Sequence, residues 1–597
     1  MGVIVTRSSL FRPVVPVSLA VCCMFTCGDP SDAPRTSTDG TSNPSGMTSP
    51  ASLDAVAQPL PPDAAPPHQQ FYRYLNFEPV GLDFSMTGYQ SLGSEFVFER
   101  LCMLDHNLEL VPGAAERWEV SQDGRIWTFH INPKARWSDN QPVTAQDFEY
   151  TFKRLLDPNG GNVYAFFYYD IKGAKAYNQR KTTDENTIGV RAIDPRTLEI
   201  ETENPCAYLP YIVQYPTSSP VPRWQVEKYG VRWTEAGKCV TNSAYQLDEW
   251  IPGKWMSFGL NPYYDGPNRG RLRKITRIFT GYVGSTSAAT ASGLAPYENN
   301  ETDLFTVTSP VDLSRIRKDA TLKNQLWEYD GFATQYLSFR TLGPPFNDLR
   351  VRQAFAHAID KEEVATGVLG GTGLPAYTML PPRFPGYVGD KYSSIQRYDP
   401  TLAKRLLAEA GYPNGKGFPT VELWLSDVAP GSPVAQVAQA LQQKLADNLS
   451  IKITIRNAEG KTYLKSMYNW EIPLAIGGFG YDYPDPQSYL GVPWRSQPRG
   501  YGRQDWVNGE FDAAIDKGTA ELDPTRRAQY YDEGERLLAA DVGAAFLWHT
   551  KVFELRKPWL KGIKQDRSGG YPFRANVSTA YYDLYIGKEA PGDRIRR

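Results

Sequence analysis

The chain has 597 residues, which is too long for one hydrophobic core, so its length predicts about three to four domains. Its 64 basic and 66 acidic residues nearly balance, which argues against a nucleic-acid binder, because such proteins carry a basic excess. The 36 Tyr, 26 Phe and 14 Trp fit either a large core or a ligand cavity lined by rings, and composition does not choose between them.

Residues 1–27 predict an export signal. Arg7 and Arg12 give it a basic start, and residues 14–25 form an apolar stretch too short to span a bilayer. Cysteines at the end of such a stretch resemble a bacterial lipoprotein signal, in which a cysteine is lipidated. We therefore expect a lipid anchor, with plain secretion as the alternative. The candidate for lipidation is Cys27, or else Cys22 or Cys23.

The next segment, residues 28–70, predicts a disordered tether. It is rich in Pro, Ser, Thr, Ala and Asp, and such a composition cannot bury enough apolar surface to fold. We expect the folded body to begin at Phe71.

The body mixes strand and helix patterns along the chain. Residues 117–131 alternate apolar and polar side chains around an Asp-Gly turn, which predicts a hairpin. Residues 144–158 predict a helix capped by Thr144. Further along, the patterns predict a strand over 197–205, two strands within 245–266, and helices over 348–370 and 402–415. A helix is then expected to lead into a strand over 450–458, and another helix to be followed by a buried apolar run over 524–549. With no repeat of fixed period, this mixture predicts a multi-domain α/β protein.

Three cysteines lie in the body. An export signal permits disulfides, and we expect Cys206 to pair with Cys239, 33 positions later. Closing such a loop stabilises a fold by about 3–4 kcal/mol. Cys102, in an apolar run, is expected to be a buried free thiol. The alternative is three unpaired buried thiols.

The sequence contains no recognisable catalytic or metal motif. Its five histidines form no HxxxH or HxH pair, and GxSxG and GxxxxGK[ST] are missing. No CxxC pair or spaced Cys/His set suggests zinc, and calcium loops are missing too. We expect neither an enzyme nor a cofactor, although a carboxylate pair hidden among the many acidic residues leaves a hydrolase open.

Residues 477–486, GGFGYDYPDP, place Asp482 between two tyrosines. The residue types alone favour a turn, because aspartate followed by Tyr-Pro readily initiates one. The second interpretation is a counter-ion for a cationic ligand, since a buried carboxylate is costly without a charged partner. Neighbouring glycines would let a ligand backbone approach closely.

Several blocks resemble the family 5 extracellular solute-binding proteins, which include the oligopeptide- and dipeptide-binding proteins of ABC importers. The resemblance extends in order from Phe71 to the end of the chain. The blocks that carry it are residues 115–158, 218–250, 344–364, 402–417, 480–486 and 555–563.

The resemblance implies an α/β, two-lobed periplasmic-binding-protein fold, a clamp hinged at crossing strands, with an additional third domain. Domain I is expected to combine residues 71–98, 224–332 and 556–597. Domain II is expected over 99–223 and domain III over 333–555. A ligand would shift such a clamp from open to closed.

The resemblance also implies a peptide site. Asp482 falls where relatives pair an aspartate with the α-ammonium of the peptide, and Tyr164 where a tyrosine hydroxyl touches the peptide main chain. Tyr481 would shield the ion pair from water. Gly478 and Phe479 would form the facing wall, and Gly88, Tyr89 and Gln90 would lie near the strand that pairs with the peptide backbone.

Some positions depart from the family pattern. Two basic groups that some relatives use for the ligand carboxylate fall at Met467 and Ile476, and no histidine occurs in residues 428–434. The ligand is therefore longer, is capped at its C-terminus, or uses another cation. A cysteine pair of some relatives is replaced by Ala333 and Gly480.

The resemblance predicts a monomeric binding lipoprotein of the periplasm or cell envelope. It would capture oligopeptides between two lobes, deliver them to an ABC permease with its ATPase, and bind no nucleic acid. The alternatives are a binder of a non-peptide solute, such as an oligosaccharide, opine or metal chelate, and a surface lipoprotein for sensing or adhesion.

Overall fold

A computed structural model describes residues 56–87, 94–282, 294–499, 504–567, 569–570 and 578–592. All of them belong to one compact unit, residues 50–597. None of the helices within these ranges is both long enough and apolar enough to pass through a membrane. The expected division of the body into three domains stays a prediction.

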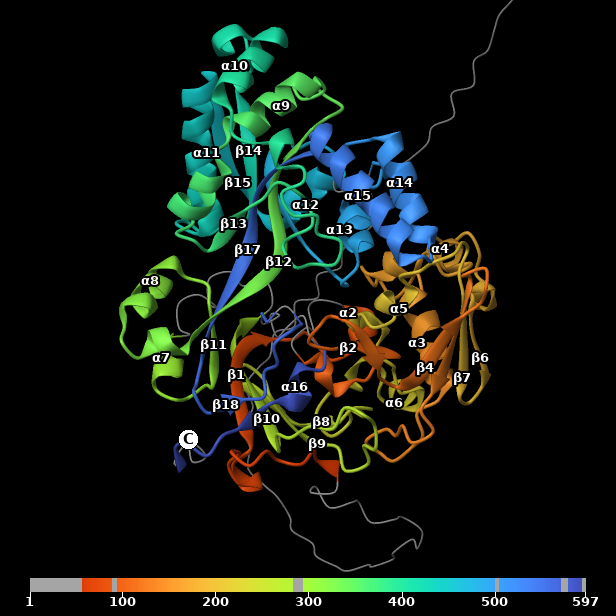
Figure 1. Ribbon diagram of the computed structural model, residues 1–597. Helices are drawn as coiled ribbons and strands as arrows, with labels where there is room; N and C mark the ends of the chain where they lie inside the picture. Colours follow the sequence, from red (N-terminus) through yellow and green to blue (C-terminus); the bar gives the residue numbers. More distant parts are fainter. Residues whose placement is uncertain are drawn as a thin grey trace, which may run out of the picture. The chain divides into compact units, whose positions relative to one another are not determined.

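The largest sheet among the described residues has eleven strands, in the order β15-β14-β16-β12-β17-β11-β1-β10-β9-β8, with β13 attached to β17 (Figure 1). Its strands are β1 (Phe71–Glu78), β8 (Tyr245–Ile251), β9 (Trp255–Leu260), β10 (Lys274–Tyr282), β11 (Leu304–Val307), β12 (Leu326–Phe339), β13 (Gly373–Pro375), β14 (Val421–Ser426), β15 (Ile453–Ala458), β16 (Leu474–Gly480) and β17 (Ala544–Arg556).

β12 and β17 join the two halves of this sheet. They are antiparallel partners of 14 and 13 residues, and no other strand in the described ranges is as long (Figure 1). One part of β17 pairs on its other edge with β11, and the last part of β12 pairs with β16. The register between β12 and β17 breaks from Asp330 to Thr334, where Phe332 has a left-handed φ of 48°. This break lies on the crossing strands that the sequence analysis expects to act as a hinge.

A second sheet holds four antiparallel strands in the order β4-β5-β7-β6, namely β4 (Ala115–Val120), β5 (Ile126–Ile131), β7 (Thr197–Glu201) and β6 (Val190–Asp194). β4 and β5 confirm the hairpin predicted over 117–131. The predicted helix over 144–158 is α3 (Ala145–Leu156), and Asp147 accepts a hydrogen bond of 2.8 Å from the backbone N–H of Thr144. Glu149 ties α3 to β6 by accepting from the backbone N–H of Ala192 at 2.9 Å.

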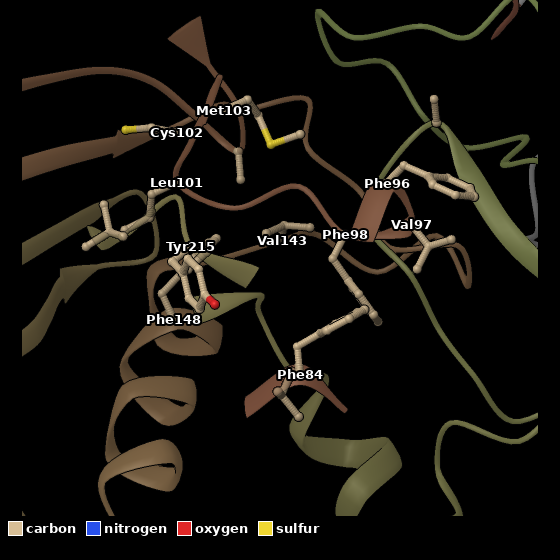
Figure 2. Packing of buried hydrophobic residues seen from close by; sticks show 14 of the residues in the cluster. Phe84, Phe96, Val97, Phe98, Leu101, Cys102, Met103, Val143, Phe148 and Tyr215 are labelled. Atoms are coloured by element: carbon tan, nitrogen blue, oxygen red, sulfur yellow. The ribbon is translucent and has the colours of Figure 1, made fainter. Parts of the chain in front are cut away.

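The hydrophobic core around α3 explains why this part of the chain folds (Figure 2). Phe84 and Phe98 meet edge to face with ring centroids 5.9 Å apart, and both are buried. Phe148 of α3 is fully buried in the same core. Burying a side chain of this size stabilises a fold by about 1.5–3 kcal/mol.

The segment before Phe71 packs against the end of the chain. Val56 and Ala65 are buried, and the backbone N–H of Ala65 donates to the carbonyl of Ile586 at 2.7 Å. The Gln70 side chain donates to the carbonyls of Ala65 and Ile586 and accepts from the Ile586 N–H at 2.7 Å. The expected tether over 28–70 is therefore corrected for residues 56–70, because buried side chains and specific hydrogen bonds hold this segment in the fold.

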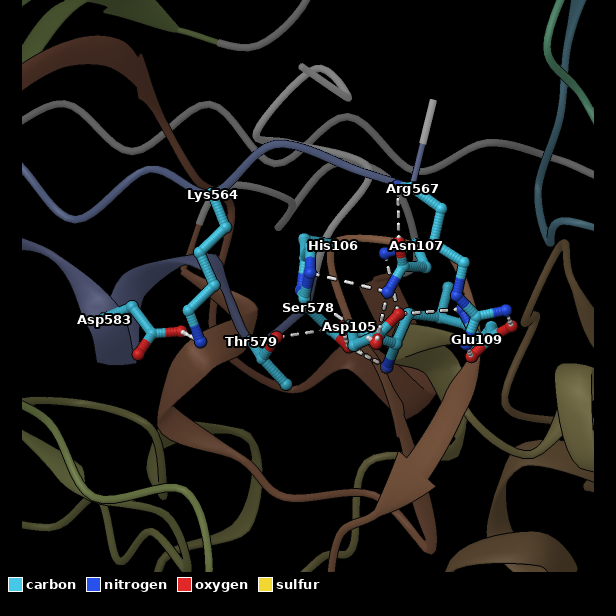
Figure 3. A network of polar contacts seen from close by, with 10 residues as sticks. Asp105, His106, Asn107, Glu109, Lys564, Arg567, Ser578, Thr579 and Asp583 are labelled. Carbon is cyan, nitrogen blue, oxygen red and sulfur yellow. Dashed lines mark hydrogen bonds and ion pairs between the residues drawn. The ribbon is translucent and has the colours of Figure 1, made fainter. Parts of the chain in front are cut away.

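Polar contacts fix the last described residues to the turn between β2 (Cys102–Leu104) and β3 (Leu110–Pro112) (Figure 3). The backbone N–H of Arg567 donates to Asn107 Oδ1 at 3.0 Å, and its guanidinium pairs with Glu109 at 2.5 Å. The backbone N–H of Thr579 donates to the Leu104 carbonyl at 3.1 Å. Segments far apart in sequence are thereby held together.

The helices after β12 are α9 (Leu349–Ala358), α10 (Pro400–Glu409), α11 (Pro433–Leu449), α12 (Gly460–Tyr468), α13 (Pro486–Trp494), α14 (Gly509–Ala520) and α15 (Pro524–Ala540). The helix expected over 348–370 ends at Ala358, and a π-helical turn, η9 (Glu363–Val368), follows. The apolar run after α15 is β17. Shorter elements are α2 (Phe84–Thr87), α4 (Ala174–Asn178), α5 (Leu209–Ile212), α6 (Arg223–Tyr229), α7 (Leu294–Glu298), α8 (Pro310–Lys318), α16 (Ala580–Asp583), β18 (Leu560–Lys561) and β19 (Tyr585–Ile586).

Candidate functional site

One edge of β16 is only partly covered. β16 pairs with β12 along its whole length, from Ala333↔Gly480 to Phe339↔Leu474. On the other side, β14 pairs only with Leu474 and Ala475. Within the described ranges, no strand continues along that side of residues 476–478. Alternate backbone N–H and C=O groups point toward each edge of a strand, so this stretch can accept another extended chain.

Asp482 lies two residues after the end of β16 and is half-buried. Its backbone N–H donates to Ser488 Oγ at 3.0 Å, and its Oδ1 accepts from the Tyr215 hydroxyl at 3.4 Å. Burial, with the Asp482 charge as the next contribution, raises the pKa of Tyr215 well above its usual range, so this hydroxyl stays protonated and donates. The Asp482 carboxylate thus lies beside an aromatic ring and is partly shielded from water. A positive charge would be attracted to it more strongly there than in bulk water.

An aromatic cluster connects Tyr164 to Asp482. Tyr164 precedes η4 (Ala165–Tyr168), and its ring lies 5.3 Å from that of Tyr215, the donor to Asp482. Phe167 lies 5.2 Å from Tyr215 and 5.8 Å from Tyr483. Tyr164 and Asp482 therefore both contact Tyr215, although 318 positions separate them in the chain.

Asp485, three positions later, has a structural role. It caps α13 by accepting from the Gln487 backbone N–H at 2.9 Å, and it forms a bidentate ion pair with Arg527 at 2.5 and 2.7 Å. Only 3% of its surface is exposed. The motif therefore contains one aspartate that organises the fold and another, Asp482, that is half-buried beside the aromatic cluster.

The other expected site residues are placed differently. Gly478 is exposed beside the uncovered part of β16. Phe479 points into the core, where it is 4% exposed and packs against Tyr489 at 5.7 Å. Tyr481 is half-buried against Phe332 and Phe384, 5.9 and 5.2 Å away. Gly88, Tyr89 and Gln90, and the cysteines Cys22, Cys23 and Cys27, lie outside the described residues.

The expected disulfide is not formed, and that prediction is wrong. Cys102, Cys206 and Cys239 are free thiols. Cys206 is buried near Asp170 and Tyr208, whereas Cys239 lies near Asp83, so the two thiols have different surroundings. Burial raises the pKa of Cys239 to about 12, which keeps it an unreactive thiol.

A cavity of about 290 Å³ adjoins the uncovered part of β16. The sequence gives no local signal for this cavity, because its walls come from five separate segments. Two of its lining residues, Met467 and Ile476, are the positions where the family resemblance expects basic groups. The cavity is lined by Tyr336, Ser338, Phe339, Arg340, Ser426, Tyr463, Leu464, Met467, Tyr468, Trp470, Ile472, Ala475, Ile476, Gly477, Gly478, Gln504 and Asp505.

Comparison with known proteins gives consistent matches. Residues 109–501 match the family model described as bacterial extracellular solute-binding proteins, family 5 middle. The chain is 30% identical to the periplasmic oligopeptide-binding protein OppA of Salmonella typhimurium, over 83% of this chain and 88% of that protein. It is 28% identical to the probable deoxycholate-binding periplasmic protein YgiS of Escherichia coli, over 90% of this chain and 97% of the relative.

Solved structures agree with these sequence matches. The unliganded open form of the periplasmic murein tripeptide-binding protein MppA superposes with a TM-score of 0.70, at 27% identity, over 89% of this chain and 99% of that chain. An OppA from Borrelia burgdorferi gives a TM-score of 0.68 at 26% identity, over 85% and 99%. The likeness confirms the expected α/β, two-lobed periplasmic-binding-protein fold.

Proposed function

Because the chain belongs to the family 5 bacterial extracellular solute-binding proteins, we propose that it captures oligopeptides by their free α-amino group and delivers them to an ABC importer. The family consists of binding proteins rather than enzymes. The observation that carries the proposal is the position of Asp482, half-buried beside tyrosines, two residues after the end of the partly uncovered strand β16.

Asp482 would hold the amino end of the ligand. An ammonium group beside this carboxylate would form charge-assisted hydrogen bonds, which are shorter and stronger than neutral ones. Tyr215 already donates to Oδ1, and a carboxylate can accept several further bonds. Tyr164, whose ring contacts Tyr215, would reach the first residues of the peptide main chain.

The edge of β16 would hold the peptide backbone. A ligand that starts at Asp482 and follows β16 toward Ile476 runs antiparallel to the strand. Main-chain hydrogen bonds to this edge would not depend on the ligand's side chains, which accounts for binding many sequences. Gly478 in this edge is exposed, and the Gln335 side chain of β12 lies against it where a side chain would otherwise stand.

The remaining parts of the proposal concern partners and location. We place the protein outside the cytoplasm as a monomer, anchored by a lipid on Cys27, or on Cys22 or Cys23, beside an ABC permease and its ATPase. The oligopeptide-binding relative and the probable deoxycholate-binding relative are both named as periplasmic proteins, which supports the location.

A non-peptide ligand is the second candidate, supported by the match to the probable deoxycholate-binding protein over 90% of this chain. Deoxycholate has a carboxylate and no amine. A ligand of this type would gain nothing from the Asp482 carboxylate. The two candidates therefore predict different responses to ligand amines.

Thermal unfolding of the purified protein with a peptide panel tests the proposal. Each peptide is supplied with a free and with an acetylated N-terminus. A ligand at 100 times its dissociation constant stabilises a protein by about 2.7 kcal/mol. We expect stabilisation by the free-amine peptides alone. Stabilisation by both forms would remove Asp482 from its proposed role, and stabilisation by neither would favour a non-peptide ligand.

A further inference from the structure

The loop after β16 places one buried ring in a hydrophobic core other than that of its neighbours. The neighbouring strand and helices form a second core, the α13–α15 core, which includes Phe479, Leu490, Phe511 and Leu538. Tyr483, in the loop between β16 and α13, is 2% exposed and belongs instead to the core around α3, the α3 core. Among the described residues between 305 and 558, no other buried apolar side chain belongs to the α3 core. Tyr483 therefore joins the two cores.

Two rings of the α3 core enclose Tyr483. Tyr208, directly before α5, stacks on it with ring centroids 5.8 Å apart and an angle of 10° between the ring planes. Phe167 of η4 meets it edge to face, with centroids 5.8 Å apart. The Tyr208 hydroxyl donates a hydrogen bond to Asp170, which fixes the orientation of the stacking ring. Both arrangements stabilise aromatic pairs beyond the area that they bury, so this contact is specific for a ring.

The backbone of the loop keeps Tyr483 in this position. Tyr483 precedes Pro484 and Asp485 precedes Pro486, and a residue before proline favours extended conformations. The backbone N–H of Asp485 donates to the Tyr483 carbonyl at 2.8 Å. The ion pair of Asp485 with Arg527 of α15 fixes the loop to the α13–α15 core. The Tyr483 ring therefore moves together with that core.

A leucine crosses in the opposite direction. Leu108, in the turn between β2 and β3, is 7% exposed and belongs to the α13–α15 core, although Met103 of β2 lies in the α3 core. Its φ of 60° is left-handed, a conformation that leucine rarely adopts, so the turn holds this side chain in place at a cost in backbone energy. Asp105 fixes the turn by accepting from the backbone N–H groups of Asn107 and Glu109 at 2.8 and 3.0 Å (Figure 3). Each core thus contains one side chain that comes from the other part of the molecule.

We propose that Tyr483 and Leu108 form a latch that holds the two lobes closed when no ligand is bound and that positions Asp482 for the ligand. This assignment rests on the proposed function, in which Asp482 binds the ligand amine. Opening the clamp would separate the two cores and expose both latch side chains to water, which is unfavourable. Asp482 directly precedes Tyr483, and its carboxylate accepts from the hydroxyl of Tyr215, a member of the α3 core, at 3.4 Å. The amine site is therefore complete only while the latch is closed.

Small-angle X-ray scattering of the ligand-free protein tests the latch. Tyr483→Ala should increase the radius of gyration, because the open arrangement becomes more populated. Tyr483→Phe keeps the ring and should scatter like wild type. The matched control is Tyr412→Ala, which removes a half-buried ring that packs on Phe418 beside a single core, and its scattering should also equal that of wild type. An unchanged radius of gyration for folded Tyr483→Ala would overturn the proposal.

Leu108→Ala tests the same latch from the other core. It shortens the side chain that enters the α13–α15 core and should also increase the radius of gyration of the ligand-free protein. If Tyr483→Ala does not fold, Tyr483→Leu takes its place, since leucine fills part of the space but cannot stack on Tyr208. No expansion in Leu108→Ala and Tyr483→Leu would refute the latch.

Calorimetric titration separates this inference from the proposed function. The probe is the free-amine peptide that stabilises the wild type most in the thermal panel. Tyr483→Ala should raise its dissociation constant by about 10- to 100-fold, because affinity falls with the closed fraction and burial of a large side chain changes an equilibrium by this factor. Saturating peptide should return the variant to the radius of gyration of wild type.

The two measurements fail in different ways. If no peptide binds the wild type, amine capture is rejected, while the scattering of the ligand-free variants still decides the latch. If Tyr483→Ala loses affinity but its ligand-free scattering equals that of wild type, Tyr483 acts only on the neighbouring Asp482, and the latch is rejected while amine capture stands.

Discussion

Asp482 and Asp485 lie three positions apart, yet their surroundings predict opposite effects of mutation. Asp482→Asn removes a charge that the proposed ligand ammonium would contact, while the amide keeps the size of the side chain. We expect an unchanged unfolding temperature and a loss of about 1.5–3 kcal/mol in binding free energy for peptides with free amines. Calorimetric titration with one peptide, supplied with a free and with an acetylated N-terminus, measures this loss of binding free energy.

Asp485→Asn provides the contrast. It breaks a buried ion pair with Arg527 and should lower the free energy of unfolding by about 3–5 kcal/mol, because the arginine loses its partner. Urea unfolding of both variants separates the two roles. Equal losses of stability, or equal affinities for the free-amine peptide in wild type and Asp482→Asn, would contradict the assignment.

Glu99 predicts a specific dependence of stability on pH. Burial raises the pKa of its carboxyl from 4.5 to about 7, although Tyr264 and Asn268 donate hydrogen bonds to it. The pKa is higher in the folded state than in the unfolded state, so ionisation opposes folding. The contribution of Glu99 to stability is therefore complete below pH 4.5 and falls by about 1–3 kcal/mol as the pH rises to about 7.

Urea unfolding at several pH values measures this dependence of stability on the ionisation of Glu99. Relative to wild type, Glu99→Gln should show a smaller decrease in stability between pH 4.5 and 7, because the amide does not titrate. Exposed Glu510→Gln is the control and should follow wild type. Parallel curves for Glu99→Gln and wild type would exclude Glu99 as the source of the dependence.

At the scale of elements, residues 56–70 contribute to the fold through Val56, Ala65 and the three hydrogen bonds of the Gln70 side chain. A chain that starts at Phe71 should lose about 3 kcal/mol or more of unfolding free energy relative to one that starts at residue 50. Gln70→Ala in the longer chain should lose about 1–3 kcal/mol. Equal unfolding temperatures for the two chains would show that the segment adds no stability.

Local patterns predicted elements whose signals lie within one stretch of sequence. The hairpin of β4 and β5 has alternating side chains, and α3 has a capping threonine, so both were predictable. Residues 56–70 look like a linker, since their order depends on partners near Ile586. The pairing of Cys206 with Cys239 was inferred from spacing, which says nothing of their separate surroundings.

The candidate site was predictable only in part. The motif around Asp482 and the family resemblance together identified Asp482, and the resemblance identified Tyr164. The structure connects the two residues through Tyr215. Phe479 was expected on the ligand wall, but strand alternation turns it into the core, whereas Gly478 is exposed.

At the scale of the whole molecule, the proposed ligand contacts come from segments far apart in the chain. Tyr164 and Asp482 belong to different expected domains, so a ligand that contacts both stabilises the arrangement in which they are close. The break in register at Phe332, on the strands that connect the halves of the sheet, is where backbone rotation would disturb the fewest paired residues.

Those same two strands have a consequence for how the protein melts. β12 and β17 contribute to both halves of the eleven-stranded sheet, so the unfolding of either half removes pairing partners that these two strands share with the other. We expect the body to unfold cooperatively, as one transition whose calorimetric and van't Hoff enthalpies agree. Two resolved transitions in scanning calorimetry would show instead that the break at Phe332 uncouples the halves. Strands proposed to permit motion would thus also make the body a single thermodynamic unit.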